Sequence, residues 1–299
     1  MKPKLSIGLP VHNGERFLRQ ALDSLLGQSF GQIEVLICDN ASTDRTPEIA
    51  AEYARADERV RIHRNNANIG GAPNFNLAFK LTSAPYFKWS AHDDVCRSDY
   101  LAECMTVLER DASVALCHSA VELIDEHGRV VRAHDEELPL VGSDCPAVRF
   151  RDLIFSDHWC TSMFGVMRRS LLSKTPLIAR HVGSDRNLLA ELGLLGRFHL
   201  VPRPLFQNRD HRERSVNATD VRSSERAAWF DPATKNKITL PYVRCWYEYL
   251  RAVRRAPLSP KQRSDCYRAL AAWPTSNRWQ LRQDVEHAAR RVVSRLRAE

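Results

Sequence analysis

Short apolar runs that each end in a polar, acid-bearing loop constrain this chain more than any other feature. The first third of the sequence contains three of them: Leu5–Leu9 before Pro10–Glu15, Val35–Cys38 before Asp39–Asp44, and Tyr86–Trp89 before Ser90–Asp94. Each run is followed by turn residues and then by helical spacing, which is typical of strand, loop and helix. In an open parallel sheet such loops gather at the carboxyl edge, where ligands bind. We therefore expect Asp39, Asp93 and Asp94 to lie around one crevice.

Clustered carboxylates predict a cation in that crevice. Asp39, Asp93 and Asp94 would repel one another if no positive charge lay between them. Oxygen ligands of this kind suit hard divalent cations such as Mg2+ or Mn2+. We therefore expect one of these two ions as a cofactor.

Length and composition indicate one large α/β domain with an insertion or a tail. The chain has 299 residues, of which 43% are hydrophobic and 27% are charged. No apolar run approaches the roughly 18–20 residues that span a bilayer, and the run before Pro10 is too short for a signal peptide. The eight cysteines form no CxxC pair. We therefore expect reduced, mostly structural thiols and a cytoplasmic location.

The net charge of +8 is concentrated near the carboxyl terminus. Residues 241–299 contain 13 Lys/Arg and 5 Asp/Glu, so the remainder of the chain is neutral. No nucleic-acid-binding motif accompanies the basic segment, and we expect no nucleic acid partner. An anionic membrane surface, a polyanionic partner, and a merely solvated helical surface all stay open as explanations.

Apolar runs alternate with helical patterns over most of the chain. Strands are predicted at 5–9, 35–38, 60–63, 86–89, 114–124, 129–131, 163–167, 198–201 and 205–206, and helices at 15–26, 46–55, 73–80, 98–110 and 185–195. This alternation indicates a doubly wound, mostly parallel sheet. Segment 133–161 has no clear period. Beyond residue 217 we expect helices that break at Pro232, Pro241, Pro257, Pro260 and Pro274.

The last predicted helix, 279–296, is basic and amphipathic. Its apolar residues recur at helical spacing: Leu281, Val285, Ala288, Ala289, Val292, Val293 and Leu296. We expect this stripe to pack on the rest of the chain or on a second subunit. Weak, salt-sensitive attraction to the inner face of the membrane would be an addition to that packing.

Four motifs together resemble family 2 glycosyltransferases. They are Pro10-Val11-His12-Asn13-Gly14-Glu15, Asp39-Asn40-Ala41-Ser42-Thr43-Asp44, Asn68-Ile69-Gly70 and His92-Asp93-Asp94, in that order. The resemblance covers residues 4–216 and implies a GT-A fold, with inversion at the sugar carbon. It divides the chain into a glycosyltransferase domain, 1–216, and a basic helical extension, 217–299. Within the domain, 1–120 would hold the nucleotide sugar and 121–216 the acceptor.

The resemblance assigns the donor side of the site. Asp39 would hydrogen-bond the base, usually uracil, and the nucleotide set would comprise Pro10, Val11, Asn13, Glu15, Asp39, Asn68 and Asp93. Asp94 would hold the metal, while Asp93 would contact the ribose or the metal's water shell. His92 stands where the longer form of the motif has another acid, and His12 and His92 would line the pocket. From the residues alone, Asp39 is equally a turn residue and Asp44 a helix cap.

A second region, Gly183-Ser184-Asp185 before an apolar helix, matches the family's acidic pair, with Ser184 in place of the first acid. Asp185 would be the general base, although it also suits a helix N-cap. His211 would reach the metal or the diphosphate, and Arg209 or Arg214 is a further candidate for that contact.

The implied reaction is metal-dependent transfer of a hexose-type sugar, preferably from a UDP-sugar, to a carbohydrate or lipid-linked acceptor in surface polysaccharide or glycoconjugate synthesis. A sugar-phosphate nucleotidyltransferase is an alternative, but its Gly-rich loop with a following Lys is absent, as is the GxGxxG of a dinucleotide-binding dehydrogenase. An inert nucleotide-sugar-binding scaffold is the third reading. The presence of Asp39, Asp94 and Asp185 argues against it.

Overall fold

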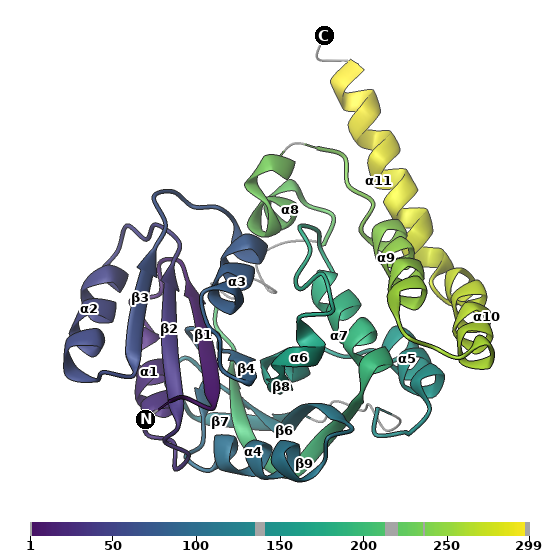
Figure 1. Cartoon of the computed structure of the whole chain (residues 1–299). Coiled ribbons are helices and arrows are strands. Elements are labelled where there is room, and N and C mark those ends of the chain that lie inside the picture. Colours follow the sequence, from purple (N-terminus) through teal and green to yellow (C-terminus); the bar gives the residue numbers. More distant parts are fainter. Residues whose placement is uncertain (1, 135–140, 213–220, 236, 297–299) are drawn as a thin grey trace.

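A single mixed sheet runs through the centre of the molecule (Figure 1). The computed structural model describes residues 2–134, 141–212, 221–235 and 237–296. Within them the strands are β1 Leu5–Val11, β2 Ile33–Asp39, β3 Val60–Arg64, β4 Tyr86–Trp89, β5 Val95–Cys96, β6 Val114–Ile124, β7 Val130–His134, β8 Val166–Arg168 and β9 Arg197–Arg209. Their order is β3-β2-β1-β4-β8-β6-β9-β5, and β7 pairs with β6.

The half of the sheet that contains β3, β2, β1 and β4 is parallel, as the strand–loop–helix pattern predicts. All seven residues of β1 are buried. The register aligns Val11 with Asp39, so β1 and β2 end side by side. The Asn40 N–H donates to the Val11 carbonyl at 2.8 Å and continues this alignment into the loops. The predicted crevice therefore has two adjacent loops along its edge.

The other half mixes directions, with β8 antiparallel to β4 and β6, and β9 parallel to β6. The two short strands predicted at 198–201 and 205–206 are in fact one strand, β9, of thirteen residues. Pro202 and Pro204 do not interrupt it, because the ladder with β6 shifts register near Ala120 at that point. A bulge of this kind accommodates residues that cannot donate to the ladder.

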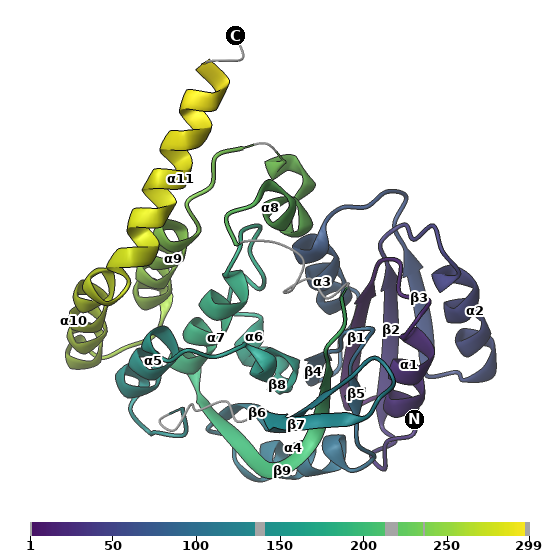
Figure 2. The ribbon, with the colours of Figure 1, turned by 180° about the vertical axis from the view of Figure 1, so that it is seen from behind.

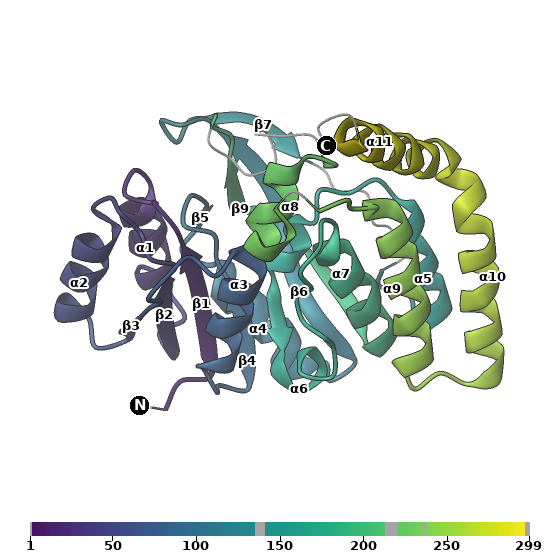
Figure 3. The same cartoon turned by 90° about the horizontal axis from the view of Figure 1, so that it is seen from above.

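Helices cover both faces of the sheet (Figures 2 and 3). They are α1 Leu18–Leu26, α2 Thr46–Ala56, α3 Gly71–Lys80, α4 Tyr100–Arg110, α5 Pro146–Phe155, α6 Arg169–Leu172, α7 Ser184–Leu195, α8 Ser224–Phe230, α9 Pro241–Arg255, α10 Pro260–Ser276 and α11 Arg278–Leu296, with 3-10 turns η1 at Thr161–Phe164 and η2 at Pro232–Thr234. The five helices predicted up to residue 195 are confirmed, with ends that differ by a few residues. The strand predicted at 163–167 is instead the end of η1 followed by β8.

Helix α5 lies in the segment that has no clear period in the sequence. Its buried apolar residues have helical spacing, but Arg149 and Asp152 are buried among them and obscure it. Arg149 is only 3% exposed. Its Nε donates to the Gly193 carbonyl and its Nη1 to the Ser143 carbonyl, both at 2.6 Å. A polar side chain with such partners can occupy a core position.

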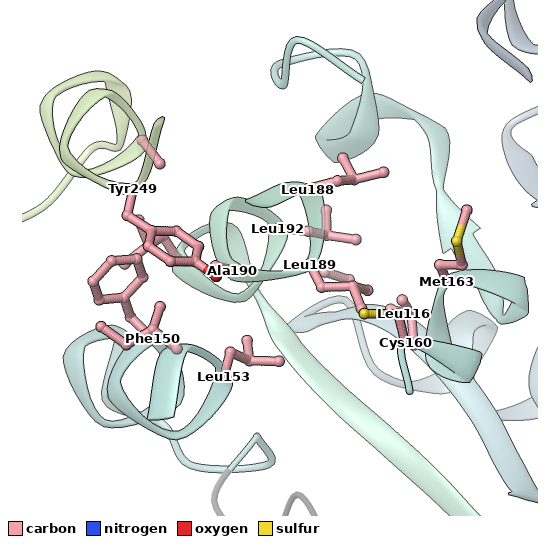
Figure 4. Packing of buried hydrophobic residues seen from close by; sticks show 14 of the residues in the cluster. Leu116, Phe150, Leu153, Cys160, Met163, Leu188, Leu189, Ala190, Leu192 and Tyr249 are labelled. Atoms are coloured by element: carbon pink, nitrogen blue, oxygen red, sulfur yellow. The ribbon is translucent and has the colours of Figure 1, made fainter. Parts of the chain in front are cut away.

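Helices α9 and α10 share a hydrophobic core with α5 and α7. Figure 4 shows α7 at the centre, with Phe150 and Leu153 of α5 and Tyr249 of α9 on one side and Met163 on the other. Trp273 Nε1 donates to the Ile154 carbonyl at 3.0 Å. The start of the predicted extension is therefore built into the body of the protein.

The break predicted at Pro274 does not occur, because α10 continues to Ser276. A proline within a helix leaves the carbonyl four residues earlier without its N–H donor. Here that carbonyl belongs to Leu270, and Trp246 Nε1 of α9 donates to it at 3.1 Å. A tryptophan from the neighbouring helix thus replaces the missing hydrogen bond.

Helix α11 extends from α10 away from the rest of the molecule (Figure 1). Asp284 holds its first half: the fully buried carboxylate accepts from the Tyr242 N–H at 2.7 Å and from Arg222 Nε at 3.1 Å. Beyond it, Val285 is 60% and Leu296 69% exposed. The expectation that the whole stripe packs on the rest of the chain is therefore wrong, because the helix projects beyond the core. Contact with a second subunit or a membrane stays a prediction.

No described helix combines the length and the apolar character that a membrane span requires. All eight cysteines are free, and all except Cys145 are buried.

Replacement of Asp284 by alanine should lower the free energy of unfolding by about 3 kcal/mol, because the buried Arg222 guanidinium and the first N–H groups of α9 lose their acceptor. Urea unfolding followed by tryptophan fluorescence would measure this. Asp265→Ala is the matched control: its partner Arg268 has a side chain 76% exposed, and we expect about 0.5 kcal/mol or less. Equal losses in the two variants would contradict the anchoring role of Asp284.

Candidate functional site

A pocket of about 1100 Å3 opens at the carboxyl edge of the parallel strands. The predicted site residues that line it are Pro10, Val11, Asn13, Glu15, Asn68, Asp93, Asp94, Asp185 and His211. His12 and His92 line it as well, as expected. Among the predicted residues that the structure describes, Asp39 and the alternative candidate Arg209 are not part of the lining. Segments far apart in the sequence thus meet at one site.

The loops after β1 and β2 are joined by reciprocal hydrogen bonds. Asn13 Oδ1 accepts from the Thr43 N–H at 2.9 Å, and Glu15 Oε2 accepts from the Arg45 N–H at 2.9 Å. In return, the Glu15 N–H donates to Asp44 Oδ2 at 3.0 Å. The side chains of Asn13 and Glu15, both predicted to bind the nucleotide, therefore form hydrogen bonds with the neighbouring loop. Their first role is to hold the pocket edge together.

Asp39 lies beneath the pocket wall and is 1% exposed. Its Oδ1 accepts from the Ser42 N–H at 3.0 Å, which is the turn geometry that an aspartate favours. Its Oδ2 lies 3.2 Å from Nε of Arg64, whose side chain is 55% exposed. The turn role of Asp39 is therefore confirmed, and its contact with a nucleotide stays a prediction.

Amide side chains connect the loop after β2 with the loop before α3. Asn40 Nδ2 donates to Asn68 Oδ1 at 2.9 Å, and Asn40 Oδ1 accepts from Asn65 Nδ2 at 2.9 Å. Asn74 Nδ2 donates to the Cys38 carbonyl at 2.8 Å. The predicted ligand Asn68 is therefore one member of a network that shapes this wall.

Asp94 is a buried anchor. It is 4% exposed, although it lies in the connection between β4 and β5. Its Oδ1 accepts from Asn208 Nδ2 and from the Arg209 N–H, both at 2.9 Å. These contacts tie the acidic loop to the end of β9. Removal of the carboxylate would therefore disturb the fold as well as any ligand.

Asp93 faces His211 across the pocket floor. His211 Nε2 lies 2.9 Å from Asp93 Oδ2, and the His211 ring packs on Phe17 with centroids 4.8 Å apart. Burial alone would raise the pKa of Asp93. The nearby His92 and the hydrogen bond with His211 outweigh it, so the pKa of Asp93 lies below its usual range and the group is a carboxylate near neutral pH.

Arg209 does not reach the pocket. It is 1% exposed, and its guanidinium donates to the Asp93 carbonyl at 2.8 Å, to Gln20 Oε1 at 2.7 Å and to the Asp125 carbonyl at 3.1 Å. Its guanidinium stabilises the acidic loop through the bond to the Asp93 carbonyl. The other candidate for a phosphate contact, Arg214, lies outside the described residues.

The acidic pair and His211 can accommodate a divalent cation. Across the described residues, no three His, Cys, Asp or Glu side chains form a ready-made metal site. A cation that also binds a diphosphate, however, needs only one or two protein ligands. Neighbouring ligands of an octahedral ion with bonds of about 2.1 Å lie about 3 Å apart. The 2.9 Å separation of Asp93 Oδ2 and His211 Nε2 matches that spacing.

Asp185 lies in the first turn of α7, and the helix N-cap is Gly183, so the N-cap expectation for Asp185 is wrong. Gly183 has a φ of +82°, and a Cβ added there would lie 2.7 Å from Cys245 Sγ of α9. Both the left-handed backbone and the close helix contact therefore require glycine. Asn187 Nδ2 donates to the Cys245 carbonyl at 3.0 Å. The contacts with α9 therefore fix the position of the first turn of α7, which carries Asp185.

Sequence reasoning missed one wall of the pocket. It comes from α8 and from the loop before η1, and its main residues are Trp159, Arg226, Trp229 and Phe230. The segment after residue 217 carries no motif, so only its aromatic pair could have indicated this wall. The glycine pair Gly70-Gly71 is a second indication in the sequence, because it suggests that another part of the chain packs closely there. In the structure a Cβ on Gly71 would lie 2.9 Å from the Trp229 ring.

Gly183→Ala should lower the free energy of unfolding by about 2–4 kcal/mol, because a left-handed backbone and an overpacked contact add together. Gly31→Ala is the control: nothing lies within 4 Å of an added Cβ there, and we expect a change within about 0.5 kcal/mol. Chemical denaturation would compare the two. If Gly183→Ala is no more costly than the control, the Cys245 contact does not constrain this position.

The sequence and the fold are similar to those of known proteins. The sequence model of the family described as glycosyl transferase family 2 matches residues 6–175. An uncharacterized glycosyltransferase of Rickettsia felis is 31% identical over 144 residues, which are 46% of this chain and 23% of that protein. Chondroitin synthase of Escherichia coli is 32% identical over 130 residues, which are 43% of this chain and 19% of that enzyme. The chain therefore spans about a quarter or less of the length of these relatives.

Two solved structures are similar along nearly the whole chain. S. aureus TarS 1–349 in complex with UDP-GlcNAc has a TM-score of 0.65 at 15% identity, over 93% of this chain and 72% of that one. The mannosyltransferase PcManGT of Pyrobaculum calidifontis, in complex with GDP-Man and Mn2+, has a TM-score of 0.60 at 17% identity, over 100% and 76%. At these identities the likeness concerns the fold.

Proposed function

This chain belongs to glycosyl transferase family 2 and has the GT-A type of fold, and on that premise we propose that it catalyses metal-dependent, inverting transfer of a sugar to an acceptor hydroxyl. The donor is a nucleoside diphosphate sugar of the hexose type, with a UDP-sugar favoured. One observation carries the proposal: the pocket contains the acidic pair with His211 and, in the same cavity, the carboxylate of Asp185.

The donor base belongs against the paired ends of β1 and β2. Pro10 and Val11 supply an apolar surface there, and Asn68 closes the neighbouring wall. Asp39 Oδ2 would accept a hydrogen bond from the base edge, in competition with Arg64. TarS has been solved with UDP-GlcNAc, and this supports a uridine donor for the present chain.

The diphosphate belongs above the acidic pair. We assign the cation to Asp93 and His211, and assign Asp94, the expected metal ligand, mainly to the support of that loop, because its Oδ1 already accepts two hydrogen bonds. When bound, Mn2+ or Mg2+ would neutralise the charge that develops on the leaving diphosphate. PcManGT, solved with GDP-Man and Mn2+, supports a metal of this kind.

Asp185 is the proposed general base. Its carboxylate would accept the proton of the acceptor hydroxyl while that oxygen attacks C1 of the donor sugar. The bond from C1 to the diphosphate oxygen breaks on the opposite face, and the nucleoside diphosphate leaves. One displacement of this kind inverts the configuration at C1, and no nucleophile on the enzyme is required.

The acceptor is a carbohydrate or a lipid-linked saccharide, and the pathway is surface polysaccharide or glycoconjugate synthesis. Chondroitin synthase, a polysaccharide-forming enzyme by its name, is among the relatives. A nucleotidyltransferase would not need a lone carboxylate beside the sugar, and an inert scaffold would not need a base at all. The placement of Asp185 in the donor pocket therefore favours transfer over both alternatives.

Replacement of Asp185 by asparagine should leave UDP binding intact and reduce turnover about 10²–10⁴-fold, because proton removal is lost while the shape is kept. Release of UDP from a panel of UDP-sugars and acceptors would report the rate, and calorimetry the binding. Asp144→Asn, at an exposed aspartate outside the pocket lining, controls for the loss of a surface carboxylate. Near-normal turnover of Asp185→Asn, or a product that keeps the anomeric configuration of the donor, would refute the mechanism.

His211→Ala should abolish the strengthening of UDP binding by Mn2+ and leave the metal-free affinity unchanged, because one proposed metal ligand is removed. Calorimetry with and without Mn2+ would measure this. For the acidic pair, Asp94→Asn keeps an Oδ1 acceptor and should fold normally, whereas Asp94→Ala should lose about 2–3 kcal/mol of stability. Full transfer activity in excess EDTA would exclude the metal from the reaction.

A further inference from the structure

Two partly exposed tryptophans line the pocket. Trp159 is 48% and Trp229 40% exposed, whereas Trp89 and Trp273 are almost completely buried in the core. An indole that is exposed within a cavity offers a large, rigid, apolar face with a polar N–H at its edge. Sugar rings have an apolar face of similar size, so a saccharide is the ligand that this surface fits.

The loop that carries Trp159 is tied to the residue next to the proposed base. Arg186 Nη1 donates to the His158 carbonyl at 2.9 Å, and Arg186 Nη2 donates to the Ser156 carbonyl at 2.7 Å. These two bonds hold the loop against the start of α7. Trp159 is therefore positioned by the same helix turn that presents Asp185.

Helix α8 lines the same pocket as Asp185. Arg226, one turn earlier on α8, interacts electrostatically with Asp185: burial lowers the pKa of Arg226, and the charge of Asp185 opposes that shift. Trp229 itself packs on Gly71 and lies 6.3 Å from Phe75 between ring centroids. Both tryptophans thus belong to elements that adjoin Asp185.

Each tryptophan is accompanied by an arginine. The guanidinium carbon of Arg226 lies 5.9 Å from the Trp229 ring centroid, and that of Arg132 lies 5.9 Å from the Trp159 ring centroid. A guanidinium beside an indole can bind a carboxylate or phosphate while the ring contacts the sugar to which that group is attached. Arg226 lines the pocket, whereas Arg132 lies outside its lining.

We propose that Trp159, Trp229 and Arg226 form an acceptor subsite for a saccharide that carries an anionic group. The inference rests on the proposed transfer reaction and adds the chemical class of its acceptor. The sugar ring lies on the indoles, the anionic group pairs with Arg226, and the hydroxyl to be glycosylated faces Asp185. The anion is either the carboxylate of a uronic acid in a glycan or the phosphate of a lipid-linked saccharide.

Binding measurements in the presence of UDP and Mn2+ would test the subsite and separate the two sources. One probe is a tetrasaccharide of alternating hexuronic acid and N-acetylhexosamine, with its methyl ester as the neutral counterpart. The other is an N-acetylhexosaminyl diphosphate on a short alkyl chain. We expect one of the two anionic probes to bind and the methyl ester to bind about tenfold more weakly or not at all.

Single substitutions test the contribution of each side chain of the subsite separately. Trp159→Ala and Trp229→Ala should each weaken the bound probe about tenfold, whereas Trp229→Phe, which keeps an aromatic ring, should keep most of the affinity. Arg226→Met should weaken the anionic probe about tenfold, and Arg226→Lys less. UDP affinity should stay unchanged in all of them.

Helix α11 offers a matched control, because Arg282 lies 6.0 Å from the ring of the exposed Trp279, outside the pocket. Trp279→Ala and Arg282→Met should change no affinity. Loss of UDP binding in Arg226→Met would assign this arginine to the donor and overturn the subsite, as would equal binding of the acid and its methyl ester. If the wild-type protein binds UDP but neither anionic probe, the acceptor class is wrong while the transfer reaction stands. If it does not bind UDP, the proposed function fails first.

Discussion

The hydrogen bonds of the Asp94 carboxylate connect the two halves of this molecule. The acidic loop leaves β4, which belongs to the parallel half of the sheet, and the end of β9 belongs to the mixed half. Asn208 Nδ2 and the Arg209 N–H meet the same carboxylate oxygen, and the Arg209 guanidinium returns to the Asp93 carbonyl. A buried carboxylate with two donors is strongly held. The distance between the acidic pair and His211, two residues beyond Arg209, follows from this joint.

The polar residues of the site serve the scaffold as much as a ligand. The side chains of Asn13 and Glu15 bind backbone N–H groups of the next loop, and Asn68 binds Asn40. Loops at a sheet edge expose many backbone donors and acceptors that need partners. When these partners are short polar side chains, the edge is organised before a ligand arrives, and less ordering entropy is lost on binding.

The sequence was informative wherever local chemistry decides the outcome. The strand that ends in Asp39, the strand that leads into the acidic loop, and the helix that follows Gly183 could be located from turn residues and apolar spacing alone. The sequence could not predict α5, because Arg149 finds acceptors in the core only after distant segments have folded around it. The continuity of α10 through Pro274 depends in the same way on Trp246 of another helix. For the site, motifs predicted the loops at the sheet edge, whereas tertiary contacts alone bring Trp159 and Trp229 to the pocket that contains Asp185.

The contact between Gly183 and Cys245 also limits how this sequence can diverge. The two positions share one small volume: the absence of a Cβ at 183 is what leaves room for a sulfur at 245. A larger residue at position 245 can be accepted only if α9 shifts, and such a shift would move the turn that carries Asp185. Substitutions in α9, which carries no motif, are therefore limited by the need to keep Asp185 in position. Among descendants that keep this architecture, positions 183 and 245 should change together or not at all.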